Sequence, residues 1–238
     1  MKEKLTAVIL AAGKGARFDE GTPKVFTNIA GKPVCWYSIY SFQKMDSVEK
    51  IYVVVAPEWL EYAKRIQKKY FKNITKFKSF ITGGRERQDS VYNALKIIQA
   101  EGKCEYVAIH DAARPFIKPQ LIFDIFKQAI ETGAATCGIT VIDTIKRLND
   151  RGFIIDHPNR NDLVAIQTPQ IFSYEKLLKA YLHAKKKSLS FTDDTEVYSM
   201  IDKKINVVPG DKDLMKITYR EDLKAANEII KTNKNLWK

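Results

Sequence analysis

The chain has 238 residues, of which 45% are hydrophobic and 29% are charged. This composition is typical of a folded globular protein and excludes an intrinsically disordered chain, and no apolar run has the roughly 20 residues that a membrane-spanning helix needs. The formal net charge of +12 would suit a nucleic-acid partner, but the lysines are spread over expected helix faces without interleaved aromatic residues, so we expect a solvated surface and no nucleic-acid partner.

Cysteine usage and the N-terminal residues indicate the cellular setting. Cys35, Cys104 and Cys137 lie far apart and have no metal-ligand spacing. We therefore expect buried, unreactive thiols rather than catalytic ones. The charged first residues lead directly into an apolar run, so we expect no signal peptide, no membrane segment and a cytoplasmic protein.

The N-terminal segment TAVILAAGKGARFDEGTPK predicts a buried strand, residues 7–10, that opens into a basic, glycine-containing loop. Glycine allows the backbone to approach a ligand and to turn its N–H groups toward phosphate oxygens. The segment lacks the Gly-Lys-Ser/Thr ending of a P-loop, and residues 19–23 do not suit the immediate helix start of a dinucleotide-binding fingerprint. We predict a triphosphate-binding loop, the alternative being an ordinary strand-to-helix turn. Its candidate ligand-binding residues are Gly13, Gly15, Arg17 and Lys24.

The segments that follow alternate between helix and strand patterns, which predicts a mostly parallel sheet with right-handed crossovers. The apolar residues of VCWYSIYSFQKM fit a buried helix, and IYVVVAP is typical of a strand covered on both faces. The expected helices cover residues 34–45, 58–70, 89–98, 119–132, 174–187 and 220–231, with a short helix capped by Thr192 or Asp193. The expected strands cover residues 7–10, 51–57, 76–82, 106–109, 134–142 and 205–208.

Two further loops follow expected strands. In GGRERQDSV we expect Asp89 to cap a helix, which brings the paired glycines and the Ser90 hydroxyl to the carboxyl edge of the sheet, where ligands bind. Glu86 and Arg87 could instead be a surface ion pair, although this leaves the paired glycines unexplained. In HDAARPF, Asp111 is placed to orient a cation or to pair with a lysine of the first loop.

A histidine precedes this aspartate. His110 alone is a weak catalytic candidate, and we expect a structural, hydrogen-bonded ring.

The pattern changes at Asp143. Two turn clusters flank the short apolar run Phe153–Ile155, which predicts a β-hairpin that projects from the sheet. Such a hairpin exposes strand edges, so we expect a second subunit to cover it in a two-fold dimer. We find no linker or internal repeat, and we predict a single domain over residues 1–238 with an inserted dimerisation arm at about 143–165.

The motifs AAGKGAR with PK, GKPV, GGRERQDSV, HDAARPF, DTIKR, QTPQIF, TDD and MKIT occur in this order. Together they resemble the 2-C-methyl-D-erythritol 4-phosphate cytidylyltransferases of non-mevalonate isoprenoid biosynthesis, from Ala7 to about Ile230. The resemblance implies a Rossmann-like α/β fold of the nucleotide-diphospho-sugar transferase type. It also implies that CTP and methylerythritol phosphate give 4-diphosphocytidyl-2-C-methyl-D-erythritol and pyrophosphate. Mg²⁺ would be held mainly by the CTP phosphates, without a dedicated protein metal site.

The resemblance also implies roles for individual residues. The implied catalytic residues are Arg17, Lys24, Arg160 and Lys216. Arg17 and Lys24 would stabilise the transition state, Lys216 would position the phosphate of methylerythritol phosphate, and Arg160 would reach the partner's active site from an exchanged arm. The implied nucleotide-binding residues are Ala11, Ala12, Gly13, Gly15, Gly84, Arg85, Ser90, Asp111, Ala112 and Arg114. The implied acceptor-binding residues are Thr144, Thr168 and Thr192. The positions that depart from the family pattern are Val25, Arg85 and Val164, and they bear on arm packing and on contacts to cytosine.

Two rival functions follow from the same residues. A ribitol-5-phosphate cytidylyltransferase of the same fold would share the first loop and the QTPQ segment, but the HDAAR and QDSV segments favour methylerythritol phosphate. A non-catalytic, basic nucleotide- or RNA-binding protein is the rival from another class, and it predicts salt-sensitive polynucleotide binding.

Overall fold

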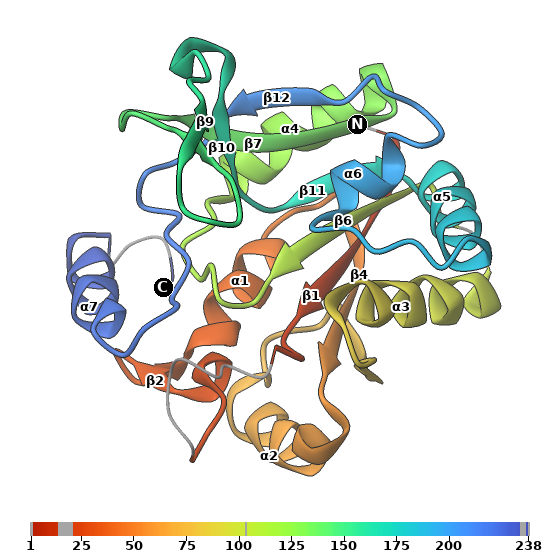
Figure 1. Ribbon diagram of the computed structural model, residues 1–238. Coiled ribbons are helices and arrows are strands. Elements are labelled where there is room, and N and C mark those ends of the chain that lie inside the picture. The colour runs from red at the N-terminus through yellow and green to blue at the C-terminus, as the bar shows by residue number, and fades with distance from the viewer. Residues whose placement is uncertain (1, 14–20, 103, 234–236, 238) are drawn as a thin grey trace.

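A large mixed sheet forms the centre of the molecule (Figure 1). The computed structural model describes residues 2–13, 21–102, 104–233 and 237. In spatial order the strands of this sheet are β10 (Val164–Ile166), β7 (Ala134–Thr140), β11 (Gln170–Ser173), β6 (Tyr106–Asp111), β1 (Leu5–Leu10), β4 (Val48–Val55) and β5 (Phe77–Thr82), and β12 (Asn206–Pro209) pairs with β7. The predicted α/β class is confirmed.

The parallel half of the sheet is built around β1. This strand pairs in parallel with β4 on one side and with β6 on the other, so that Val8 lies opposite both Tyr52 and Ile109. Strand β5 adds to β4, again in parallel. The continuous apolar runs in β1 and β4 arise because both faces of the sheet are covered at these strands, as predicted for a parallel sheet.

Helices cover the two faces as separate layers (Figure 1). Buried side chains of α1 (Val34–Gln43), α2 (Leu60–Tyr70), α4 (Pro119–Thr132) and α7 (Asp222–Thr232) belong to one core. Those of α3 (Arg87–Glu101), α5 (Tyr174–Lys186) and α6 (Asp194–Tyr198) belong to the other. Because side chains alternate along a strand, Ala7 and Ile9 of β1 enter the first core and Val8 enters the second.

Some strands were not predicted. Strand β11 lies antiparallel between β6 and β7, where Ile171 pairs with both Ala108 and Ala135. Its apolar run is only two residues long, which is too short to indicate a strand, so pairing on both sides specifies it. Strand β10 pairs antiparallel with β7. The small hairpin of β2 (Asn28–Ile29) and β3 (Lys32–Pro33) turns through Ala30 and Gly31 at positive φ.

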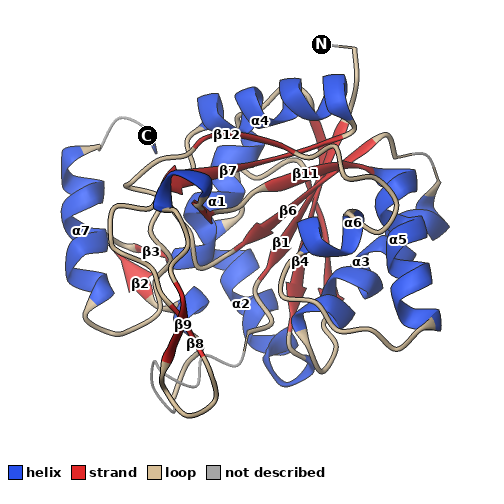
Figure 2. Cartoon of the chain, turned by 45° about the horizontal axis from the view of Figure 1, so that its top comes forward, coloured by secondary structure: helices blue, strands red, loops and turns tan. Residues whose placement is uncertain are grey.

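The predicted projecting hairpin is present as β8 (Arg147–Leu148) and β9 (Ile154–Asp156), a two-stranded sheet separate from the main one (Figure 2). Its turn is fixed by Asn149, whose Oδ1 accepts hydrogen bonds from the N–H groups of Arg151 and Phe153. Gly152 takes a φ of +80° there, a conformation that favours glycine. Short 3-10 helices occur at Lys24–Phe26, Pro57–Trp59 and Arg160–Asp162.

The cysteines have the environment expected of unreactive thiols. Cys35 and Cys137 are buried and Cys104 is partly buried. Burial raises the pKa of the Cys35 and Cys137 thiols to about 12 and that of Cys104 to about 11, so all three stay protonated at neutral pH. None of the helices that the structure describes is long and apolar enough to cross a bilayer.

Candidate active site

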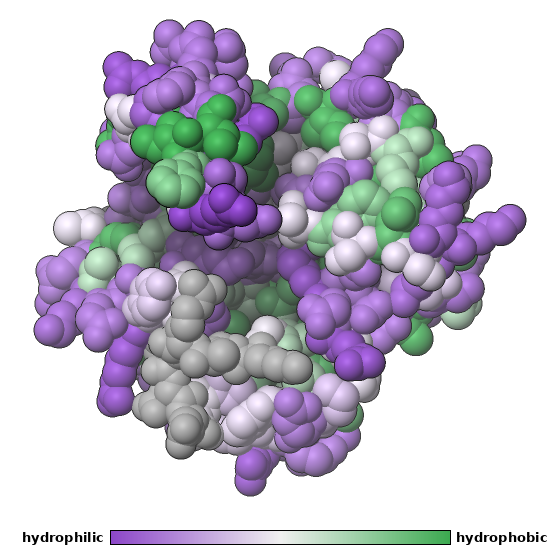
Figure 3. All heavy atoms as spheres, in the orientation of Figure 1, coloured by the Kyte–Doolittle hydropathy of each residue, from purple (hydrophilic) through white to green (hydrophobic). Residues whose placement is uncertain are grey.

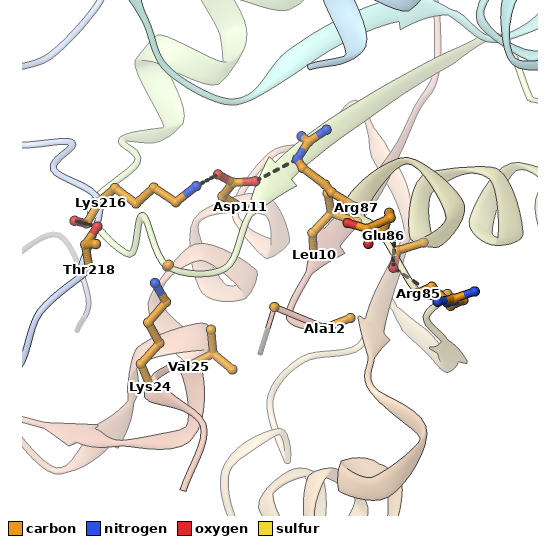
Figure 4. Close-up of a pocket in the computed structure, with 14 residues that line it drawn as sticks. Leu10, Ala12, Lys24, Val25, Arg85, Glu86, Arg87, Asp111, Lys216 and Thr218 are labelled. Atoms are coloured by element: carbon orange, nitrogen blue, oxygen red, sulfur yellow. Dashed lines mark hydrogen bonds and ion pairs between the residues drawn. The ribbon is translucent and has the colours of Figure 1, made fainter. Parts of the chain in front are cut away.

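A pocket of about 410 Å³ opens at the carboxyl ends of β1 and β6 (Figure 4). Strand order reverses at this point, since β4 and β6 lie on opposite sides of β1, and open α/β sheets bind ligands at such switch points. In the space-filling view, hydrophilic residues (purple) lie in and beside the hollow near the centre of this face (Figure 3). The predicted site residues that line the pocket are Ala12, Gly13, Lys24, Gly84, Arg85, Ser90, Asp111 and Lys216.

Asp111, the last residue of β6, is the centre of the charged contacts in this pocket. Its Oδ2 accepts a hydrogen bond from Lys216 Nζ at 2.7 Å, and its Oδ1 lies 3.5 Å from Arg87 Nε (Figure 4). Burial opposes ionisation, but Arg87 and Lys216 outweigh it and hold the pKa of the Asp111 carboxyl well below its usual range. Asp111 is therefore an anion at neutral pH.

Arg87 connects this carboxylate to a second, fully buried one. Its Nη1 lies 2.7 Å from Asp194 Oδ2, and the Tyr181 hydroxyl donates to Asp194 Oδ1 at 2.6 Å. Burial disfavours the charged guanidinium, but Asp194 and Asp111 outweigh this and raise the pKa of Arg87. Arg87 is thus an internal bridge, and the alternative of a surface ion pair with Glu86 is wrong.

Arg87 was not predicted as a site residue, although it lines the pocket. The signal available in the sequence was its place at the start of a helix that follows paired glycines. The other lining residues that sequence reasoning missed are Leu10, Val25, Glu86, Ala113 and Thr218.

The paired glycines pack closely against neighbouring residues. A Cβ at Gly83 would lie 2.7 Å from the Ala12 Cβ, and a Cβ at Gly84 would overlap Asp89. The buried Ser90 hydroxyl accepts a hydrogen bond from the Gly84 N–H at 3.1 Å and donates one to the Glu86 carbonyl at 3.2 Å, so its polar atom has partners beside the pocket. The prediction that Asp89 caps the helix is wrong: α3 begins at Arg87, and Glu86 is the N-cap in a reciprocal capping box with Asp89.

Of the loop that follows β1, the structure describes residues 11–13 and the residues from 21 onward. Ala11 is buried, and Ala12 and Gly13 reach the pocket wall. The predictions for Gly15 and Arg17 lie outside the described residues. Lys24 begins a 3-10 helix whose next two residues are buried, so its backbone is fixed against the core while its side chain lines the pocket.

Other predicted residues are not among the described lining residues, namely Ala11, Ala112, Arg114, Thr144, Arg160, Thr168 and Thr192. Ala112 is fully buried, and Arg114 donates from Nη1 to the Leu214 carbonyl at 2.9 Å.

The predicted acceptor-side residues lie on several segments. Thr168 is buried, and its hydroxyl accepts a hydrogen bond from the Asp111 N–H. Thr192 is exposed before α6 and donates to Glu196. Thr144 and Arg160 are exposed in the segment that contains the hairpin, and Arg160 Nη1 donates to the Ile142 carbonyl at 3.2 Å.

His110 has the structural role expected for it. The ring is fully buried, with Nε2 3.1 Å from the Arg114 carbonyl and Nδ1 3.1 Å from Thr168 Oγ1. Burial lowers the pKa of His110 to about 4. The ring is therefore neutral at neutral pH and helps to fix the end of β6.

This burial predicts acid destabilisation in a defined window. Below the unfolded-state pKa of 6.5 the unfolded chain binds a proton that the folded chain does not bind until the pH approaches 4, so stability falls as pH falls through this range. We expect His110 to account for a loss of about 2 kcal/mol in unfolding free energy between about pH 7.5 and about pH 5, measured by urea denaturation.

The His110→Asn variant should show a smaller pH slope, whatever its absolute stability. The matched control is His183→Gln, because this ring is exposed. An unchanged slope in His110→Asn would contradict the expectation.

The sequence of the chain matches a known protein family. Residues 5–232 match the sequence model of the 2-C-methyl-D-erythritol 4-phosphate cytidylyltransferases. The chain belongs to this family.

Relatives and solved structures agree with this membership. Proteins of Clostridium botulinum and Clostridium perfringens with the family's name are each 40% identical over 227 and 229 residues, which cover 95% and 96% of this chain and 97% and 99% of theirs. A crystal structure of 4-diphosphocytidyl-2C-methyl-D-erythritol synthase from Anaerococcus prevotii superposes with a TM-score of 0.83 at 25% identity, covering 96% of each chain.

Membership in the 2-C-methyl-D-erythritol 4-phosphate cytidylyltransferase family confirms several predictions. The protein is a nucleotidyltransferase, and the comparisons favour this family over a ribitol-phosphate enzyme and over a non-catalytic binding protein. The pocket at the β1/β6 switch point is thus the candidate active site of a cytidylyltransferase-family chain.

Proposed function

We propose that the protein transfers the cytidylyl group of CTP to 2-C-methyl-D-erythritol 4-phosphate and releases pyrophosphate. The observation that carries this proposal is the pocket itself, where the ammonium-bearing side chains of Lys24 and Lys216 line one hollow with the loop that follows β1 (Figure 4). Two cationic side chains beside this loop suit two phosphorylated substrates.

The chemistry needs orientation and charge stabilisation more than it needs a base. The acceptor is a phosphate monoester whose second pKa is about 6, so its oxygen is mostly ionised at neutral pH and can attack directly. The phosphate oxygen forms a bond to the α-phosphorus of CTP while the bond to the pyrophosphate oxygen breaks. The protein must hold these groups in line and stabilise charge on the five-coordinate phosphorus.

We assign these tasks to residues in two sets. Lys24, with Arg17, would stabilise the α-phosphate and the leaving pyrophosphate, and Lys216 would hold the acceptor phosphate. The nucleotide side would be formed by Ala11, Ala12, Gly13, Gly15, Gly84, Arg85, Ser90, Asp111, Ala112 and Arg114, and the acceptor side by Thr144, Thr168 and Thr192.

The pocket suits a Mg²⁺ ion that is bound mainly by substrate. The described residues contain no group of three or more His, Cys, Asp or Glu side chains that could hold a metal ion. The carboxylates that line the pocket belong to Asp111 and Glu86. Mg²⁺ commonly binds through one or two carboxylates and the phosphates of a nucleotide, so Asp111 would hold it with CTP, and the ion would neutralise triphosphate charge.

We further propose that residues 143–165 form the arm of a two-fold dimer and that Arg160 acts in the partner's site. Apolar side chains are exposed on this segment, including Phe153 at 65% and Ile155 at 57%, and green atoms gather over it in Figure 3. Leaving such side chains in water is unfavourable, and the same segment of a second copy would cover them.

The deciding experiment measures pyrophosphate release from CTP and Mg²⁺, with methylerythritol 4-phosphate and ribitol 5-phosphate assayed in parallel. We expect release with methylerythritol phosphate and little with ribitol phosphate. Release with ribitol phosphate alone would refute the acceptor assignment but leave the CTP assignment standing. No release with either acceptor, together with salt-sensitive polynucleotide binding, would refute the proposed enzyme activity.

A further inference from the structure

The segment 210–217 carries Lys216 to the pocket, and backbone hydrogen bonds fix its two ends. The N–H of Gly210 donates to the Gly138 carbonyl at 2.7 Å, and the N–H of Ile217 donates to the Ala113 carbonyl at 2.8 Å. This segment, which we name the Lys216 loop, contains no helix or strand. Something other than regular secondary structure must therefore set its shape between the two ends.

The side chain of Gln167 makes the central contacts to the Lys216 loop. Its Oε1 accepts from the Asp211 N–H at 3.1 Å, and its Nε2 donates to the Asp211 carbonyl at 2.8 Å and to the Leu214 carbonyl at 3.4 Å. Gln167 is only 4% exposed, so water does not compete for these bonds. A buried amide that uses both its donor and its acceptor on one segment specifies the position of that segment.

The loop is shaped to admit this amide. A Cβ at Gly210 would overlap Gln167 Oε1, so glycine is needed for the close approach. Arg114 adds a second contact on the same stretch, since its Nη1 donates to the Leu214 carbonyl. Leu214 is two residues before Lys216, so only Met215 separates the bonded carbonyl from the residue that reaches Asp111.

We propose that Gln167 is a positioning residue that acts on the reaction through Lys216. Gln167 is not among the described residues that line the pocket, whereas Lys216 is. The amide fixes Asp211 and Leu214, the loop fixes Lys216, and Lys216 Nζ lies 2.7 Å from Asp111. A displacement of about 1 Å at such a residue can cost about a hundredfold in rate. The effect on catalysis rests on the function proposed above, and the effect on the loop does not.

Gln170, three residues after Gln167, offers a matched control. It is 1% exposed, its Nε2 donates to Asp193 Oδ2 at 2.8 Å, and its Oε1 accepts from the Asp194 N–H at 3.1 Å. Replacing either glutamine with methionine removes a buried amide of similar size. Neither of these Gln170 bonds is to the Lys216 loop, so we expect only the Gln167 change to loosen that loop.

The first test does not depend on activity. Hydrogen–deuterium exchange of the full-length protein should show faster exchange of the 210–217 amides in Gln167→Met than in the wild type, by about tenfold or more. Gln170→Met should leave that peptide near the wild-type rate. Equal exchange of the 210–217 peptide in all three proteins would overturn the proposal.

The second test is a double-mutant cycle on kcat/KM for methylerythritol phosphate. Gln167→Met should lower this constant by about tenfold or more in the wild-type background and by less than about threefold in a Lys216→Met background, because the residue it positions is then gone. Gln170→Met should have similar effects in both backgrounds. Additive losses for Gln167→Met would refute its action through Lys216.

These outcomes distinguish a failure of the proposed function from a failure of the proposed role of Gln167. An inactive wild type would count against the proposed function, while the exchange result would still decide the role of Gln167. If Gln167→Met does not fold, Gly210→Ala disturbs the same contact from the loop side, and it should give the same exchange pattern and the same dependence on Lys216. A normal 210–217 exchange rate in Gly210→Ala would then overturn the proposal.

Discussion

Replacement of Lys24 with alanine is expected to lower turnover by about a hundredfold or more, which corresponds to about 2.7 kcal/mol of transition-state stabilisation. The side chain lines the pocket from a 3-10 helix whose following residues, Val25 and Phe26, are buried, so the ammonium group is held on a fixed backbone. A preorganised cation contributes most where charge develops during the reaction. Initial rates of pyrophosphate release at saturating CTP and methylerythritol phosphate measure the effect.

The same substitution should leave folding intact, because the two residues that anchor this helix are unchanged. Thermal unfolding checks this, and Lys68→Ala is the matched control, since Lys68 is an exposed lysine of α2. We expect the control to keep the wild-type rate. Near wild-type turnover in Lys24→Ala would show that this residue does not stabilise the transition state.

The parallel half of the fold could be predicted because its sequence pattern and its tertiary environment agree. Runs such as Ile51–Val55 are apolar throughout because helices cover both faces, and the same pattern predicts a parallel sheet. The antiparallel half could not be predicted in the same way. Residues 170–173 form β11 because β6 and β7 offer edges on both sides, and such a cause is absent from local sequence.

For the site, glycine-containing and charged loops at strand ends were sufficient to predict much of the pocket wall. Gly84 follows β5, Ser90 lies in the first turn of α3 and Asp111 ends β6, yet all three line one hollow because parallel strands bring their carboxyl ends to one edge. The electrostatic partners were less predictable. Arg87 bridges Asp111 and Asp194, residues that lie far apart in the chain, and no local pattern encodes that bridge.

Residues that contact the Lys216 loop without lining the pocket were also hard to predict. Gln167 and Arg114 contact the Lys216 loop by side-chain bonds that span more than forty residues of sequence. Sequence reasoning assigned Arg114 to the nucleotide, whereas its described hydrogen bond is to the Leu214 carbonyl. Long-range hydrogen bonds of this kind depend on packing, which a single sequence does not reveal.

The proposed arm exchange makes a strong prediction about mixed dimers. Arg160→Ala and Lys24→Ala should each be nearly inactive as homodimers, because every site in the dimer lacks one of the two cations. When the two variants are mixed and their subunits exchange at random, about one half of the dimers are heterodimers, and each contains one site with both wild-type residues. We therefore expect recovery to about one quarter of wild-type turnover.

This recovery depends on which subunit supplies Arg160. If the arm served its own subunit, every site in a heterodimer would still lack one residue, and mixing would restore nothing. Subunit exchange must be verified separately, for example by native mass spectrometry of variants that differ in isotope label. A monomeric protein at assay concentration would contradict the dimer itself, whereas a verified heterodimer without activity would contradict only the exchange of arms, since the exposed apolar side chains of the arm would be covered in either arrangement.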